Sequence, residues 1–343
     1  MNNSIKSKIL KYKKEIEWLL REKYLLPDTV ILNLFQNFSI ESKFTAWMAG
    51  RQIPSNVTLS FQSGIEKSSI SSGKRIPRLA RYWNDDKEKI LEDIARIING
   101  EPVDYVIGFK EFLNCKIDLS IKPLIPRPET EFWVKWVLDR HLLPVIYLNP
   151  SQVLNILDLC CGSGCIGVSL LKNIPNCNVT FVDISENALA QTRINLYSPQ
   201  HFEINLGSRE QKKGKIYMLK KIQHRSNIVQ SNLFSKLKGR TFDYIFCNPP
   251  YVKNIYIKGS LNYEPKIALD GKKDGLEIIY KILSQFQKYL NPGGKLFLEF
   301  GYGQKAKINK FLRLKMKNKD LQIKEYKFEK DQFGKYRVLK LQI

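Results

Sequence analysis

An asparagine, two prolines and a tyrosine follow a short apolar segment in the second half of the chain, as Asn248-Pro249-Pro250-Tyr251. The apolar residues 244–247 predict a buried strand that the prolines end, because proline cannot donate a hydrogen bond to a neighbouring strand. At the end of such a strand, the Asn oxygen and a backbone carbonyl can each accept one hydrogen of an NH2 group. This arrangement predicts a site that methylates a planar nitrogen by positioning it and supporting its developing charge. The same four residues are also typical of an ordinary strand-to-turn transition.

A glycine-rich segment follows another predicted strand, residues 153–159. Gly162, Gly164 and Gly167 fit the pattern Gly-x-Gly-x-x-Gly, which is typical of loops that bind adenosine-bearing cofactors. Asp183 ends the next predicted strand and is suited to bind a ribose diol. The pattern fits NAD as well as S-adenosylmethionine, and tight turn packing without any ligand is a further interpretation.

The elements around these two segments predict an α/β domain with a Rossmann-like sheet. Five alternating strands and helices, followed by a terminal pair of strands, form a seven-stranded and mostly parallel sheet. A polar Asn-Pro-Pro-Tyr motif after the fourth strand is typical of class I methyltransferases, and NAD enzymes have no use for it. The predicted strands are 153–159, 179–183, 227–230, 244–247, 295–299, 321–328 and 337–343, the predicted helices are 132–138, 168–172, 185–196, 275–290 and 304–314, and a turn is predicted at 291–294.

Residues 5–100 have a helical pattern and predict a small helical domain with a Ser-, Gly- and Pro-rich loop over 51–74. Its clearest helix begins near Asp85 or Asp86, either of which is a suitable cap, and ends at Asn99-Gly100. One face of this helix carries Ile90, Leu91, Ile94, Ile97 and Ile98.

The two domains are connected by residues that change from a helical to an alternating pattern. Residues 103–108 and 112–121 predict a β-hairpin. The hairpin leads into Pro126-Arg127-Pro128, a stiff segment after which Glu129 or Thr130 is expected to open a helix. The predicted organisation is a helical substrate-binding domain over 1–102, a hairpin bridge over 103–128 and a methyltransferase domain over 129–343.

The composition excludes some classes of protein and leaves others open. Hydrophobic residues make up 43% of the 343 residues, which excludes wholesale disorder, and the absence of an apolar run of 18 residues argues against a membrane span. The six cysteines form no Cys-x-x-Cys pair, so reduced thiols inside a cell are expected, with no metal site.

The formal net charge of +23 indicates an anionic partner such as RNA, the ribosome or DNA, although scattered lysines are also typical of compositional bias. Residues 207–240 hold ten basic side chains and one acid, and are interpreted as a surface insert that is either solvated or faces RNA. Residues 1–14 hold five lysines and no acid, which fits both a mitochondrial presequence and a solvated first helix.

Over about residues 85–343 the chain resembles the release-factor glutamine methyltransferases, the HemK/PrmC group. Cys161 and Cys165, which flank the glycines, resemble the fungal mitochondrial branch, so a mitochondrial location is expected, with the cytoplasm as the alternative. The segments that carry the resemblance are 105–108, 111–112, 124–131, the glycine loop, Asn248 to Tyr251, 263–265, 268–271, 274–276, Glu299 with Gly301 and Gln304, and 331–337.

The resemblance implies a monomeric enzyme that transfers a methyl group from S-adenosylmethionine to the glutamine amide of the Gly-Gly-Gln motif in a class I release factor, in translation termination. Asn248 with the Pro249 carbonyl would hold that amide, Tyr251 would lie against its flat face, and Pro250 belongs to the same catalytic motif. The methionine end of the cofactor would be lined by Cys160, Cys161, Gly162, Ser163 and Gly164, with Asp183 at the ribose, Leu233 at the adenine and Asn248 as a further cofactor-binding residue. Two positions depart from the family: Cys160 replaces the usual glycine, which restricts the backbone, and Asn232 replaces a common acid.

Two other functions stay open from the sequence. A nucleic-acid amino methyltransferase needs the same grip on the NH2 group of adenine or cytosine, and the positive charge suits it, although a base-flipping enzyme would want a separate target-reading domain. The third is an RNA-binding protein that keeps the fold without the activity.

Overall fold

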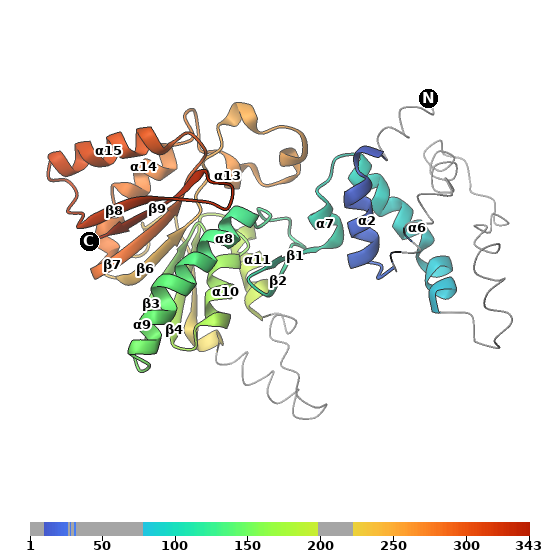
Figure 1. The fold of residues 1–343 in the computed structure, drawn as a ribbon, viewed down its shortest axis with the longest axis horizontal. Coiled ribbons are helices and arrows are strands. Elements are labelled where there is room, and N and C mark those ends of the chain that lie inside the picture. Colours follow the sequence, from blue (N-terminus) through green and yellow to red (C-terminus); the bar gives the residue numbers. More distant parts are fainter. Residues whose placement is uncertain (1–9, 27, 29–30, 32–77, 198–221) are drawn as a thin grey trace. The chain divides into compact units, whose positions relative to one another are not determined.

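The computed structural model describes residues 10–26, 28, 31, 78–197 and 222–343 (Figure 1). The predicted loop over 51–74, residues 1–9 of the lysine-rich segment and residues 207–221 of the basic insert lie outside the described residues. The chain divides into two compact units, Met1–Ile107 and Gly108–Ile343.

The first unit contains helices α2 (Lys13–Glu22), α6 (Arg78–Ile98) and α7 (Val103–Ile107). The predicted apolar face of α6 is confirmed, since all five of its residues are buried. The predicted start near Asp85 is wrong, because α6 begins at Arg78 and continues through the two acids. Buried Asp93 ties α2 to α6, since it accepts from Lys23 at 2.6 Å and from Arg96 at 2.9 Å.

The segment 103–107 was predicted as a strand and is instead the short helix α7. Pro102 precedes it, and the Pro102 carbonyl accepts hydrogen bonds from the backbone N–H groups of Tyr105 and Val106. Proline is pre-shaped for the first turn of a helix. Tyr105, Val106 and Ile107 are consecutive buried residues, and a short apolar run of this kind does not distinguish a strand from a buried helix.

The second unit opens with a β-hairpin whose strands differ from the predicted ones, since 103–107 of the predicted first strand is helix α7 and the turn at 113–114 lies inside the predicted second strand, 112–121. Strands β1 (Phe109–Phe112) and β2 (Cys115–Asp118) pair in antiparallel fashion. The two loop residues, Leu113 and Asn114, both have positive φ, at 47° and 63°. This is the geometry of a type I′ turn, which matches the twist of the strands it joins.

A seven-stranded sheet in the order β5-β4-β3-β6-β7-β9-β8 forms the centre of this unit and confirms the predicted α/β fold (Figure 1). The strands from β5 to β7 are parallel, whereas β9 is antiparallel to both β7 and β8. The chain order reverses at β3, which pairs with β4 on one side and β6 on the other. Open α/β sheets bind ligands at such a switch point. The strands are β3 (Leu154–Leu159), β4 (Cys177–Asp183), β5 (Ser226–Gln230), β6 (Phe242–Cys247), β7 (Leu290–Glu299), β8 (Glu325–Lys330) and β9 (Tyr336–Gln342).

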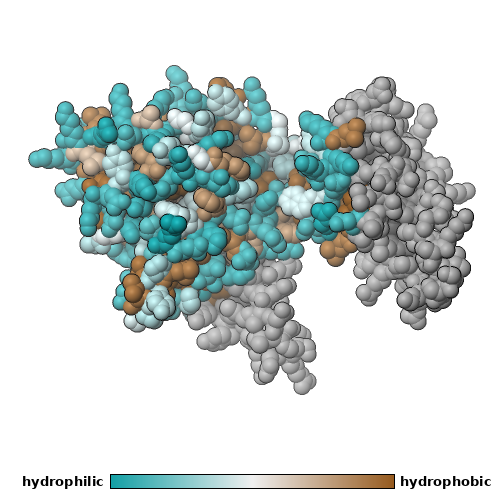
Figure 2. Space-filling model, in the orientation of Figure 1, coloured by the Kyte–Doolittle hydropathy of each residue, from teal (hydrophilic) through white to brown (hydrophobic). Residues whose placement is uncertain are grey.

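Helices cover this sheet. α14 and α15 place buried leucines and isoleucines in one cluster with β6, β7 and β9, while α10 and α11 pack near β4. Hydrophilic residues cover most of the visible face of this unit (Figure 2), and among the exposed apolar residues are Leu143 and Leu148 of α9. The helices are α8 (Pro128–Val137), continued by a π-helical turn (Leu138–Leu142), then α9 (Leu143–Leu148), α10 (Cys165–Asn173), α11 (Glu186–Tyr197), α13 (Lys266–Leu269), α14 (Glu277–Leu283) and α15 (Lys305–Lys317), with 3-10 turns at Asn254–Tyr256, Gly259–Tyr263 and Phe286–Tyr289.

Three details of the second unit differ from the prediction. Helix α8 begins at Pro128, so Glu129 and Thr130 lie inside its first turn and do not cap it. The helix predicted over 275–290 is divided into α14 and a 3-10 turn. The predicted turn 291–294 lies within β7 as a large bulge, because Leu290 pairs with Phe242 and Lys295 pairs with Tyr244.

Within the described residues, no helix combines the length and the apolar character that crossing a bilayer requires.

Candidate active site

The glycine loop and the Asn-Pro-Pro-Tyr motif meet at the switch point of the sheet. Leu159, the last residue of β3, lies opposite Cys247, the last residue of β6. Cys160 and Asn248 therefore leave neighbouring parallel strands at the same edge. The sheet brings together two segments that the sequence places far apart.

Backbone geometry in the glycine loop is left-handed at three positions. Cys160, Gly162 and Gly164 have φ values of 60°, 57° and 76°. Cys160 therefore occupies a conformation that glycine adopts more easily, and an L-residue there is strained by roughly 1–2 kcal/mol. The Cys161 N–H donates to the Val182 carbonyl at 3.0 Å, which anchors the loop to the end of β4.

The three glycines of the loop differ in the space around them. A Cβ on Gly162 would meet nothing within 4 Å, whereas one on Gly164 would lie 2.9 Å from Thr192 and one on Gly167 would lie 2.2 Å from the Phe181 ring. Gly164 and Gly167 are therefore needed to pack the loop and α10 against their neighbours. The space beside Gly162 is open, so a ligand can approach the backbone closely there.

Asp183 lies beside this loop and holds it in place. One of its oxygens accepts from the Gly162 N–H at 3.0 Å, and the other accepts from the Ser185 N–H at 2.9 Å, ahead of α11. Burial raises the pKa of Asp183, while the backbone donors act in the opposite direction.

Asp158 was not predicted as a site residue, yet it lies buried under the loop. Its Oδ2 accepts from the Gly167 N–H at 2.9 Å, and its Oδ1 is buried without a hydrogen-bond partner among the described residues. Burial raises the pKa of Asp158 to about 7. A buried carboxylate oxygen that lacks a donor fits a cationic group such as the ammonium of S-adenosylmethionine. The signal in the sequence was an acid within an apolar strand, just before the glycines.

Asn248 is held by a buried hydrogen-bond network. Its Nδ2 donates to Thr130 Oγ1 at 3.1 Å, and the Thr130 hydroxyl donates to Glu299 Oε2 at 2.7 Å. Glu299 is fully buried and also accepts from Trp133 Nε1 at 2.7 Å and from the Tyr251 hydroxyl at 2.8 Å. Burial raises the pKa of Glu299, and these donors act against that rise. Burial and the neighbouring Glu299 carboxylate raise the pKa of Tyr251 well above its ordinary value.

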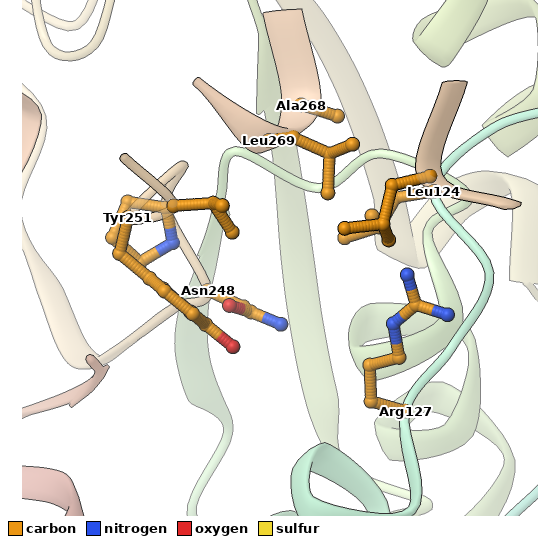
Figure 3. A pocket seen from close by; sticks show the side chains of 9 residues that line it. Leu124, Arg127, Asn248, Tyr251, Ala268 and Leu269 are labelled. Carbon is orange, nitrogen blue, oxygen red and sulfur yellow. The ribbon is translucent and has the colours of Figure 1, made fainter. Parts of the chain in front are cut away.

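A pocket of about 200 Å³ lies beside Asn248. Asn248 and Tyr251 lie on one side of it, and Leu124 and Arg127 lie on the other (Figure 3). Of the four predicted catalytic residues, Asn248, Pro249 and Tyr251 line this pocket, and Pro250 does not. The remaining lining residues are apolar: Val252, Leu261, Ala268 and Leu269.

One wall of the pocket joins two segments that are 137 residues apart in the chain. Arg127 donates to Glu264 Oε1 at 2.5 Å, and the Ile125 N–H donates to Glu264 Oε2 at 3.0 Å. Glu264 is buried, so its carboxylate neutralises the guanidinium where the two meet. A pocket with apolar walls and a paired arginine suits an uncharged polar side chain better than a free anion.

The backbone of Tyr251 is held in place by Gln304 and by two closely packed glycines. Gln304 Nε2 donates to the Tyr251 carbonyl at 3.1 Å and to the Gly275 carbonyl at 3.0 Å. A Cβ on Gly271 or Gly275 would lie 2.7 Å or 2.3 Å from Tyr251 backbone atoms. The two glycines are thus required for the close approach that fixes the motif.

The other predicted cofactor residues are mostly enclosed by protein. Ser163 is buried and its carbonyl accepts from Asn195 at 2.9 Å, and Leu233 belongs to the apolar core with a φ of 49°. Cys161 is buried, as is Cys165, which was not predicted to bind the cofactor, and burial raises the pKa of both thiols. No group of three or more His, Cys, Asp or Glu side chains suited to a metal ion is found in the described part of the chain.

Comparison with known proteins gives one matching family model, described as the methyltransferase small domain, over residues 140–219. The chain is 35% identical to a bifunctional methyltransferase of Rickettsia prowazekii, over 65% of this chain and 41% of that protein. It is 31% identical to a release factor glutamine methyltransferase of Lactococcus lactis, over 74% of this chain and 83% of that protein. Among solved structures, a methyltransferase from Pyrococcus furiosus shares 18% identity, over 73% of this chain and 98% of that chain, with a TM-score of 0.43.

The chain spans about two fifths of the length of the bifunctional relatives. Other relatives named as release factor glutamine methyltransferases are 30 to 37% identical to it and are covered over two thirds or more of their length. The identity and the coverage together show that the chain belongs to the family of release factor glutamine methyltransferases.

Proposed function

We propose that this protein transfers a methyl group from S-adenosylmethionine to the amide nitrogen of the glutamine in the Gly-Gly-Gln motif of a class I release factor. The observation that carries the proposal is the orientation of Asn248. Its NH2 group is bonded to Thr130, so its Oδ1 is the acceptor left for a substrate in the adjoining pocket. Relatives with the corresponding name support the choice of substrate.

S-adenosylmethionine supplies an electrophilic methyl group on a positively charged sulfur. The glycine loop from Cys160 to Gly164 would hold it, with open space above Gly162 for close approach. The orphan oxygen of Asp158 would accept from its ammonium group, and Asp183 would accept from the ribose hydroxyls. Leu233 would contact the adenine.

The residues of the motif would position the substrate nitrogen. Asn248 Oδ1 accepts one amide hydrogen and the Pro249 carbonyl accepts the other, which turns the nitrogen toward the methyl donor. Both acceptors would stabilise the positive charge that grows on the nitrogen as it takes the methyl group and the sulfur keeps the electron pair of the broken bond. The nitrogen loses its proton to solvent after this step, so no general base is needed beforehand.

The pocket walls would select an uncharged amide. The ring of Tyr251 faces the pocket while its hydroxyl is held by Glu299, so the ring has one fixed position. The pairing of Arg127 with Glu264 leaves no bare cation to attract a carboxylate. Glutamine would therefore be accepted more readily than glutamate.

The test is transfer of label from methyl-labelled S-adenosylmethionine to a purified class I release factor, or to unmethylated DNA and RNA, with Asn248→Ala as the control. Label on the Gly-Gly-Gln glutamine that is lost in the variant is the expected result. Label on nucleic acid alone would instead support an amino methyltransferase of adenine or cytosine. No label on any substrate, despite cofactor binding, contradicts the proposal.

We also propose that the basic surface of the protein binds RNA or the ribosome during this reaction. The support is the net charge of +23 and helix α15, which holds six basic residues and no acid. Arg225, one of the basic residues of the insert, has a structural role instead, since it donates to the Leu171, Ile174 and Pro175 carbonyls at the end of α10.

We further propose that the protein is a monomer of the fungal mitochondrial branch that acts in mitochondria, with the helical domain binding the release factor. The five lysines within residues 1–14 and the cysteines beside the glycines support this location. A fluorescent fusion to residues 1–40 that stays in the cytosol would contradict the mitochondrial proposal.

A further inference from the structure

We propose that Thr130 and Glu299 are positioning residues that set the direction of the Asn248 amide and thereby make its oxygen available to the substrate. The inference rests on the proposed function, because it assigns a role within the same methyl transfer. Neither residue lines the pocket, so Thr130 acts on the substrate through Asn248, and Glu299 acts through Thr130 and through the Tyr251 hydroxyl.

The Glu299 carboxylate is the buried centre of these contacts. It is fully buried at the end of β7 and lies within 2.8 Å of three hydrogen-bond donors. The indole N–H of Trp133 can only donate, and it shares Oε2 with the Thr130 hydroxyl. The ionised carboxylate has no hydrogen to donate, so Oε2 accepts from both groups.

The Thr130 hydroxyl carries a single hydrogen. Because that hydrogen is given to Glu299, only lone pairs of Thr130 Oγ1 remain to face Asn248. Asn248 must then present its NH2 group at 3.1 Å, since a carboxamide oxygen in that place would meet another acceptor. The direction of the amide is thus decided by a carboxylate that does not touch it.

The chain of hydrogen bonds from Glu299 through Thr130 to Asn248, called the relay below, joins three elements that pack around the site. Thr130 and Trp133 come from α8, Asn248 follows β6, and Glu299 ends β7. The Trp133 ring also stacks on Phe246 of β6, with centroids 5.8 Å apart and an interplanar angle of 16°. These contacts fix the position of α8 against β6, the strand that Asn248 follows.

The experiment compares Thr130→Val, which keeps the shape and removes the hydroxyl, with Thr130→Ser, which keeps the hydroxyl. For Thr130→Val we expect kcat to fall about 10- to 100-fold, somewhat less than the ~10²- to 10³-fold loss seen when a direct contact to the reacting group is removed. The KM for S-adenosylmethionine should stay unchanged, and Thr130→Ser should restore most of the kcat. Ser169→Ala is the matched control, because it removes another buried hydroxyl that donates at 2.7 Å to a backbone carbonyl away from the pocket.

A second measurement observes the side-chain amide hydrogens of Asn248 by NMR and does not depend on activity. In the wild-type protein the two side-chain hydrogens of Asn248 should give distinct NMR signals, one of them protected from exchange by Thr130, and Thr130→Val should lose that protection. Wild-type kcat in Thr130→Val together with unchanged protection would overturn the relay. If the wild-type protein methylates no release factor, the proposed function fails, and the relay is judged on protection alone.

Discussion

At the scale of single residues, Gly162 and Gly167 differ in what an added methyl group would meet. Gly162→Ala places a Cβ in open space and strains a left-handed backbone, which costs roughly 1–2 kcal/mol. Gly167→Ala drives a Cβ into the Phe181 ring, an overpacking that costs about 1–3 kcal/mol. We expect Gly162→Ala to weaken S-adenosylmethionine binding more than tenfold, and Gly167→Ala to act mainly on stability.

Calorimetric titration with the cofactor and urea unfolding of both variants separate these effects. Wild-type cofactor affinity in a folded Gly162→Ala variant would show that the open space does not receive the ligand.

Asp158 predicts a dependence of cofactor binding on pH. Its pKa is about 7 in the folded protein, and its ionised form is the one that attracts an ammonium group. Affinity for S-adenosylmethionine should therefore rise as the pH increases through about 7, and this rise should be absent in Asp158→Asn. Equilibrium binding of S-adenosylmethionine between pH 5.5 and 8.5 measures this dependence. Parallel curves of affinity against pH for the wild-type protein and Asp158→Asn would contradict the prediction.

The same raised pKa has a consequence for the stability of the free protein. The folded state holds the proton more tightly than the unfolded chain, whose carboxyl has a pKa of 3.8. The contribution of Asp158 to stability is therefore complete below pH 3.8 and is lost as the pH rises through about 7. Cofactor binding should offset that loss.

At the scale of elements, the segment before α8 and the segment before α13 form one wall of the pocket through Arg127 and Glu264. Arg127→Met leaves the buried Glu264 carboxylate with the Ile125 N–H as its remaining partner among the described residues. Since Arg127 is partly exposed, we expect a modest loss of about 1–3 kcal/mol in the free energy of unfolding. The KM for the release factor should rise, and the KM for S-adenosylmethionine should not.

Glu264→Gln combined with Arg127→Met is the matched variant, because it removes the uncompensated charge. It should recover part of the stability in urea unfolding and leave the KM for the release factor high. If both KM values stay at the wild-type level in the single variant, this wall does not contact the protein substrate.

Elements also show where local patterns mislead. β-prone residues at 103–107 form helix α7, because Pro102 starts a helical turn and three consecutive residues are buried together. Asn291 to Gly294 has the composition of a turn, yet the chain stays in β7 and bulges, since β6 offers a partner on both sides of the irregularity. Neighbouring elements outweighed the local preference in both cases.

At the scale of the whole molecule, the net charge of +23 predicts salt-dependent binding to a polyanion. Lys310, Arg313 and Lys317 are exposed along one face of α15 by their spacing, and they form no ion pair within the described residues. Reversing these three charges to Glu should weaken binding to ribosomal RNA. It should also reduce the slope of log affinity against log salt by about 2–3, which corresponds to about three lost phosphate contacts.

The matched control reverses Lys135, Lys281 and Lys327, which already pair with acids, and so changes the net charge equally. Filter binding at several salt concentrations measures both variants. Equal losses would assign the effect to net charge, and no binding by the wild-type protein at 0.15 M salt would identify the lysines as a solvated surface.

The sequence by itself determined the chain order of the seven strands of the main sheet, the glycine loop and the position of Asn248 at the end of a strand. These features depend on short-range properties, such as apolar runs, prolines and glycines, that act over a few residues. Only the tertiary structure decided which polar groups meet. Thr130 and Glu299 are 169 residues apart, and Arg127 and Glu264 are 137 residues apart. Hydrogen bonds of this kind require the packing of α8, β6 and β7 around one site, and no local pattern encodes that packing.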